Sequence, residues 1–143
     1  MKLKKRDIAF SQLVRMRANW KCERCGKHYG EGQRQGLDCS HFFSRSRQSI
    51  RWHPLNAAAH CRGCHQYLGA NPIEFKDWIK HYLGTTKYTV LVHLANARMR
   101  FSKAILEDVY QHLKSELKRM TALRKDGVAG RIDFEPPFLE EYD

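Results

Sequence analysis

Two cysteine pairs decide how this chain folds: Cys22-Glu23-Arg24-Cys25 and Cys61-Arg62-Gly63-Cys64. Within each pair two residues separate the cysteines, a spacing that lets both sulfurs reach one ion. Four thiolates suit a tetrahedral Zn²⁺ site, so the sequence predicts one structural zinc ion bound by Cys22, Cys25, Cys61 and Cys64. Two disulfides are disfavoured because no export signal precedes the pairs, and a redox motif is disfavoured because two pairs occur together.

The interval between the pairs, residues 26–60, is longer than in compact zinc ribbons and contains the residues of chemical interest. Asp38 and His41 lie on a predicted strand, Asn56 lies in the following connection, and His65 comes directly after the last cysteine. The fifth cysteine, Cys39, is expected to pack inside as a small apolar residue.

Local patterns predict an α+β fold of two short strands and several helices. Strands are expected over residues 37–43 and 50–52. Apolar residues at helical spacing predict helices over residues 7–18, 61–69, 71–84 and 102–125. Residues 87–97 have strand-like composition but apolar spacing that favours a helix. We expect a zinc-stabilised core over residues 1–84 with an N-terminal helix, a helical extension packed on it over 85–130, and an acidic tail over 131–143.

Charge indicates a polyanionic partner. The 143 residues include 26 Lys and Arg against 15 Asp and Glu, a net charge of +11. Residues 131–143 hold five acidic residues and one basic residue, so the body carries 25 − 10 = +15. Such a surplus is typical of nucleic-acid binding, although it also suits a merely solvated basic surface. The acidic end is interpreted first as an unstructured tail, with a partner-binding segment or a strip that competes with DNA as alternatives.

No apolar run approaches the roughly 20 residues needed to cross a bilayer, and the basic start leads into no signal-type stretch. We therefore expect a soluble, cytoplasmic protein without a membrane partner.

The motifs, taken in order, resemble the HNH (ββα-metal) nucleases. The resemblance is carried by Leu37-Asp38-Cys39-Ser40-His41-Phe42, Ile50-Arg51-Trp52, Asn56, Cys61-Arg62-Gly63-Cys64-His65 and Gly69-Ala70-Asn71. More narrowly, the pattern is similar to the NinG or Rap group of phage recombination endonucleases. The resemblance implies a phage or prophage enzyme that cleaves branched DNA, such as Holliday junctions or recombination loops, with Mg²⁺ or Mn²⁺ in the bacterial cytoplasm.

The resemblance also assigns roles to individual residues. His41 would be the general base, since an imidazole with a pKa near 6.5 can accept a proton from water at neutral pH. His65 would bind the catalytic metal, its backbone fixed by the zinc ligand Cys64. Asn56 would orient the base or brace the neighbouring loop, although an ordinary turn asparagine is nearly as good a reading.

One position departs from the commoner HNH pattern, in which an Asp or His precedes the base. Here that residue is Ser40, a poor ligand for Mg²⁺ or Mn²⁺, so Asp38 is the better candidate for the second metal ligand. In a regular strand Asp38 and His41 point to opposite faces. We therefore expect a bulge or twist that brings both to one ion.

Three arginines near the base, Arg45, Arg47 and Arg51, are predicted to contact phosphate, because the guanidinium fork matches phosphate oxygens. Arg51 is also expected to stabilise the transition state, whereas Arg45 and Arg47 fit solvated loop charges equally well. Trp20 and Trp52 are expected in the core.

Two other functions fit the same motifs: a non-catalytic zinc-knuckle protein that binds nucleic acid, and a nicking or packaging-associated HNH nuclease. A homodimer formed through residues 102–125 would supply two active sites for a symmetric junction, and a monomer fits equally well.

Overall fold

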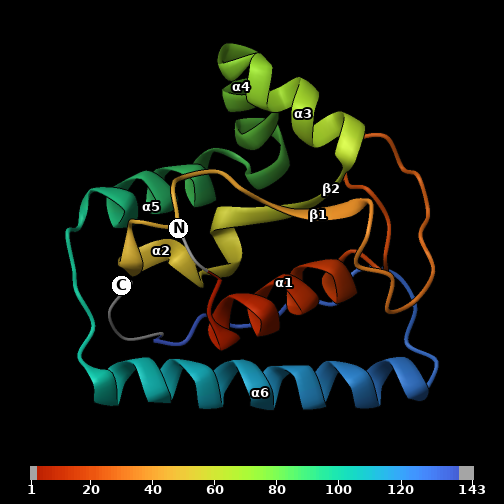
Figure 1. Ribbon diagram of the computed structural model, residues 1–143. Helices are drawn as coiled ribbons and strands as arrows, with labels where there is room; N and C mark the ends of the chain where they lie inside the picture. Colours follow the sequence, from red (N-terminus) through yellow and green to blue (C-terminus); the bar gives the residue numbers. More distant parts are fainter. Residues whose placement is uncertain (1–2, 139–143) are drawn as a thin grey trace.

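Two short antiparallel strands lie at the centre of the fold, with helices on both faces (Figure 1). The structure is a computed structural model in which residues 3–138 are described. Strand β1 (Leu37–His41) pairs with β2 (Ala57–Cys61) in an unbroken register, from Leu37 opposite Cys61 to His41 opposite Ala57. This α+β architecture agrees with the fold class expected from the sequence.

The remaining elements are helical. They are α1 (Lys5–Arg17), α2 (Gln48–Arg51), the 3₁₀ turn η1 (Pro54–Asn56), α3 (Arg62–Ala70), α4 (Pro72–Leu83), α5 (Thr85–Asn96) and α6 (Lys103–Lys125). All five predicted helices are present, including the ambiguous segment that forms α5. Ser102 caps α6 by accepting a hydrogen bond from the Ile105 amide, whereas Asp7 lies inside the first turn of α1 and binds the Lys4 amide.

The prediction of a strand over residues 50–52 is wrong. Ile50 and Arg51 lie in α2, and the strand that pairs with β1 is β2, which begins with three alanines. Alanine has little strand preference, so no alternation of apolar and polar residues marks these positions as a strand. All three alanines are fully buried, and small side chains let helices approach the strand closely from both sides.

Helix α1 lies between the sheet and α6, as the layers of Figure 1 show. Buried residues of α1, among them Phe10 and Leu13, share one core cluster with Val109, Leu113 and Met120 of α6. Trp20 and Trp52 are buried in this cluster as expected, at 7% and 3% exposure. The apolar face of α6 therefore packs inside the chain.

The opposite face of the sheet is covered by the aromatic residues of α4. Phe42 contacts Phe75, Trp78 and Tyr82 edge-on, and the His60 ring lies 4.6 Å from the ring of Trp78. A second, smaller cluster joins α2 to α5 through Ile50, Leu91, Leu94 and Ala95. Within residues 3–138, no helix has the length and apolar character that crossing a membrane requires.

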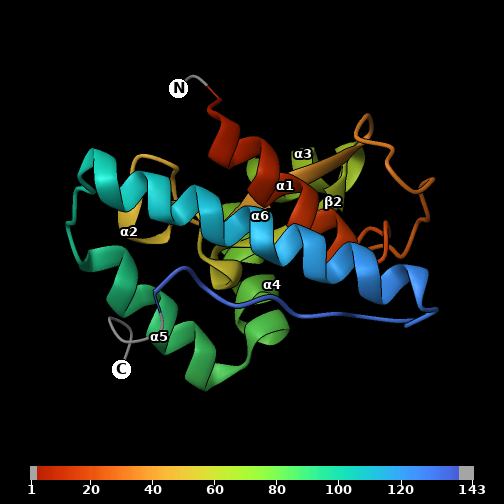
Figure 2. The same cartoon turned by 90° about the horizontal axis from the view of Figure 1, so that it is seen from below.

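The interpretation of residues 131–138 as an unstructured tail is wrong. This segment runs beside α6 (Figure 2) and buries Ile132 and Phe134 to 7% and 4% exposure. The Ile132 amide donates to the Arg17 carbonyl at 3.3 Å, and the Arg17 guanidinium lies 5.2 Å from the centre of the Phe134 ring. The rest of the predicted acidic tail, residues 139–143, falls outside the described residues.

Replacing Phe134 with alanine should therefore destabilise the whole protein. Removing a buried ring typically costs about 3–5 kcal/mol, and here the contact with Arg17 is lost as well. Urea unfolding of Phe134→Ala, compared with the exposed Val128→Ala, measures this cost. Equal free energies of unfolding for the two variants would contradict a packed C-terminal segment.

Candidate functional site

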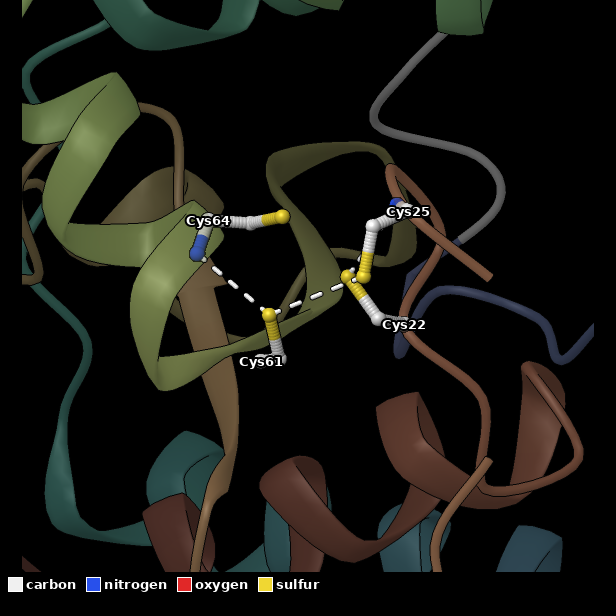
Figure 3. A group of neighbouring side chains, drawn as sticks. All are labelled: Cys22, Cys25, Cys61 and Cys64. Carbon is white, nitrogen blue, oxygen red and sulfur yellow. Dashed lines mark hydrogen bonds between the residues drawn. The ribbon is translucent and has the colours of Figure 1, made fainter. Parts of the chain in front are cut away.

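The four cysteines of the two pairs point toward one another (Figure 3). Their sulfur atoms all lie within 4.8 Å of each other, and the Cys25 and Cys61 sulfurs are 3.7 Å apart. A tetrahedral zinc ion with bonds of about 2.3 Å requires sulfurs about 3.8 Å apart, so this donor set fits Zn²⁺. Among residues 3–138 it is also the only group of three or more potential ligands close enough to share an ion.

Backbone amides donate hydrogen bonds to two of the four sulfurs. The Cys25 amide donates to the Cys22 sulfur at 3.5 Å, and the Cys64 amide donates to the Cys61 sulfur at 3.3 Å. Burial alone would raise the pKa of the Cys22 thiol, but hydrogen bonds from backbone amides outweigh burial and lower that pKa to about 7. Cys61 both ends β2 and caps α3, so the second pair lies at the joint between strand and helix.

Glu23 brings the first cysteine pair to the second. Its amide donates to the Ala59 carbonyl at 2.8 Å, and its carboxylate accepts from the Ala59 amide at 2.9 Å. The other carboxylate oxygen accepts from the Tyr82 hydroxyl and from Arg131. Sequence reasoning missed this residue. The sequence does contain a signal for it, because Glu23 lies between two cysteines. A carboxylate beside two thiolates is repelled by their charge unless it has hydrogen-bond partners of its own.

Arg24 supplies positive charge at the cysteine cluster. Its guanidinium donates to the Cys64 sulfur at 3.3 Å and lies 4.6 Å from the centre of the Tyr67 ring. Glu74 lies 3.9 Å from the same guanidinium and accepts a hydrogen bond from the Tyr67 hydroxyl. Arg24 therefore joins α3 and the start of α4 to the cysteine cluster.

A cleft of about 650 Å³ runs between α1 and the edge of β1 that does not pair with β2. Four of the predicted site residues line it, namely Asp38, His41, Arg45 and His65. Asp7, Ser11 and Arg15 line it from α1, and Arg34 lines it from the loop before β1. Sequence reasoning did not assign Arg15 or Arg34 to the site. Asp7, Ser11 and Arg15 are four residues apart and therefore share one face of α1. This spacing was the sequence signal that α1 presents a polar face to the site.

The His41 ring is held in one orientation. Its Nε2 lies 3.2 Å from the Arg51 carbonyl oxygen, which can only accept, so Nε2 carries the hydrogen and Nδ1 of the neutral ring is unprotonated. Burial lowers the pKa of His41 below its usual value, although the bond to the Arg51 carbonyl opposes that effect. At neutral pH the ring is therefore neutral and can accept a proton at Nδ1.

Asp38 and His65 form the second half of the site. The Asp38 carboxylate lies 3.0 Å from His65 Nδ1 and also accepts from Arg62 Nε at 3.1 Å. Burial would raise the pKa of Asp38, but the hydrogen bonds from His65 and Arg62 outweigh it and lower that pKa. A carboxylate beside an imidazole is a donor set that Mg²⁺ or Mn²⁺ can use, with water and phosphate oxygens completing the shell.

The expected bulge in β1 is absent, and that prediction is wrong. The register from Leu37 to His41 is continuous, so Asp38 and His41 lie on opposite faces of the strand. Both reach the same cleft because the cleft follows the strand edge. Ser40 is fully buried, away from the cleft, and within the described chain its hydroxyl has no hydrogen-bond partner. Asp38 is accordingly the candidate ligand of the two.

Asn56 braces the loop that follows β1. Its side chain accepts from the Phe43 amide at 2.9 Å and donates to the carbonyls of Phe43 and Ile50 at 3.1 and 3.2 Å. The residue is fully buried, so it does not reach substrate directly. Its contribution is to fix the path of residues 43–50, which carry Arg45.

Two of the three predicted phosphate-binding arginines, Arg47 and Arg51, lie outside the cleft. Arg47 donates to the Ala95 carbonyl of α5 at 2.7 Å. Arg51, with a side chain only 9% exposed, forms an ion pair with Asp7 at 2.6 Å. Neither lines the cleft, so direct phosphate contact and transition-state stabilisation by Arg51 do not fit this structure. Both arginines have structural partners because α2 must be held to α1 and α5.

No family model, curated protein or solved structure matches this chain. The function is therefore inferred from the chemistry of the cleft together with the motif resemblance.

The cysteine cluster predicts one zinc ion per chain. Cys64→Ala should lose stoichiometric zinc and about 3 kcal/mol or more of stability, because binding free energy at a structural zinc site contributes to folding. Cys39→Ala is the matched control, since Cys39 lies outside the cluster. Elemental analysis with thermal unfolding measures both effects, and equal zinc content in the two variants would argue against the site.

Proposed function

We propose that this chain is a metal-dependent HNH-type endonuclease that hydrolyses DNA phosphodiesters, with branched recombination intermediates such as Holliday junctions and D-loops as substrates. One observation carries the proposal. His41, whose Nδ1 is unprotonated, lines the same basic cleft as the Asp38–His65 pair. A base and a site for a divalent cation are the two groups that hydrolysis of a phosphodiester by activated water requires.

The order of elements supports the same assignment. His41 ends β1, Asn56 immediately precedes β2, and His65 lies on α3, so the site is built on a strand–strand–helix unit. This is the arrangement that the resemblance to ββα-metal nucleases implies. The preference for branched DNA rests on that resemblance alone, because a fold hosts many functions.

In the proposed reaction His41 Nδ1 accepts a proton from the attacking water, and the Arg51 carbonyl stabilises the resulting imidazolium through Nε2. Asp38 and His65 would hold Mg²⁺ or Mn²⁺, which when bound polarises the phosphate and stabilises the leaving oxygen. Arg34 and Arg45 add positive charge to the cleft and attract the phosphate backbone. Arg15 also lines the cleft, but it is only 8% exposed and donates to the Leu37 carbonyl at 2.7 Å, so its role there is structural.

The cysteine cluster would have a structural role in this enzyme. Cys64 is followed directly by His65, so a zinc ion bound to Cys64 fixes the start of α3 and the position of the His65 backbone. The chemistry of hydrolysis then takes place in the cleft, away from the thiolates.

Substituting His41 tests the proposal. His41→Ala should reduce cleavage of a supercoiled plasmid and of a four-way junction by about 10²–10⁴-fold in Mg²⁺ or Mn²⁺, because a general base contributes that much. DNA affinity, measured by gel shift without divalent ions, should stay the same. Wild-type protein that binds both DNAs and cleaves neither would instead indicate a non-catalytic zinc-knuckle protein. Cleavage at one duplex site with indifference to branches would indicate a nicking or packaging-associated nuclease.

The pH dependence of cleavage follows from the environment of His41. The neutral ring is the active form, and burial lowers its pKa below 6.5. The rate should therefore remain above half of its maximum at pH 6.5 and decline only at lower pH. Initial rates between pH 5 and 8, with zinc content verified at each pH, measure this acid limb. A midpoint above pH 6.5 would contradict the assigned base.

A further inference from the structure

We infer that Asp7 and the side chain of Arg51 are positioning residues for His41, because their buried ion pair holds the Arg51 carbonyl where it accepts the Nε2 hydrogen of His41. The inference deepens the proposed function and rests on it for its catalytic meaning. The contact itself can be measured without DNA cleavage.

The Asp7–Arg51 pair is bidentate and enclosed. Arg51 Nε donates to one Asp7 oxygen at 2.9 Å and Nη2 donates to the other at 2.6 Å. The same carboxylate accepts from the Lys4 amide at 2.7 Å and from Trp52 Nε1 at 3.1 Å. Asp7 and Arg51 are only 4% and 7% exposed. The pair therefore fixes the end of α2 against the first turn of α1.

Helix α2 needs such external support because it has only four residues. Its start is held on α5, where Arg47 and Ser49 donate to the carbonyls of Ala95 and Leu94. Its end is held on α1 by the Asp7–Arg51 pair. The Arg51 carbonyl belongs to the residue whose side chain is anchored, so a shift of that side chain moves the acceptor of the His41 bond.

The ion pair also keeps the electrostatic environment of His41 balanced. The Asp7 charge raises the pKa of His41, whereas the charges of Arg51 and Arg45 lower it. Asp38 and His65 face the same cleft from β1 and α3, and Arg15 and Arg34 face it from α1 and the loop before β1. A lone carboxylate at position 7 would favour the imidazolium, whereas the Asp7–Arg51 ion pair adds little net charge near the ring.

The test uses the zinc-loaded full chain and compares Asp7→Asn and Arg51→Lys with Glu116→Gln. Asparagine keeps the size of Asp7 without its charge, and lysine keeps the charge of Arg51 without the guanidinium fork. Glu116 forms a similarly bidentate ion pair with Arg119 on α6, outside the cleft, so its variant controls for the loss of a partly buried pair. NMR detects the His41 Nε2–H resonance, assigned by its absence in His41→Ala.

We expect the Nε2–H of His41 to exchange with solvent at least about tenfold faster in Asp7→Asn and Arg51→Lys, and cleavage to fall about 10- to 100-fold, since small displacements of a catalytic group cost this much. Glu116→Gln should change neither quantity, even where its stability falls. If Asp7→Asn does not fold, Arg51→Lys alone decides the result.

Unchanged Nε2–H exchange in folded Asp7→Asn or Arg51→Lys would overturn the inference. Equal acceleration of exchange in Glu116→Gln would also overturn it, because the effect would then be one of global stability. If the wild type cleaves no DNA, the proposed function fails, while the exchange measurement still decides whether Asp7 and Arg51 position His41.

Discussion

The structure around the cleft depends on closing the chain between Cys25 and Cys61. These cysteines are 36 positions apart in sequence, and closing a loop of that length costs on the order of 3 kcal/mol of chain entropy. Glu23 offsets this cost by binding both the amide and the carbonyl of Ala59, two residues before Cys61. A zinc ion on the four sulfurs would add to the same closure. Once the loop is closed, β2 and α3 are in place beside β1.

Once that loop is closed, three separate elements contribute residues to the candidate site. His41 and Asp38 come from β1, His65 from α3, and Asp7 and Arg15 from α1. Polar contacts at the borders of the site fix β1 and the neighbouring helix α2, since a strand of five residues and a helix of four have few contacts of their own. Buried polar networks of this kind specify geometry when all members are bonded, which is the case for the Asp7 carboxylate.

Many of the arginines that give the chain its positive charge bind other groups of the protein. Arg17, Arg47 and Arg124 donate to backbone carbonyls, and Arg51 and Arg131 pair with carboxylates. Guanidinium groups suit hydrogen bonds to carbonyls and carboxylates because they present several donors in a fixed plane and remain charged. The net charge therefore overstates the exposed basic surface of the chain. The arginines that line the cleft are Arg15, Arg34 and Arg45.

The sequence by itself indicated the cysteine cluster, the five longer helices and the candidate residues Asp38, His41 and His65, because ligand spacing and apolar period are local properties of the chain. The tertiary structure decided that Ala57–Cys61 is a strand and that Ile132 and Phe134 belong to the core. It also decided that Arg51 binds Asp7. Each of these outcomes depends on a partner distant in sequence: β1 for the alanines, α1 for Ile132 and Phe134, and the first turn of α1 for Arg51. Local propensity contains no information about such partners, so only the packed chain could assign them.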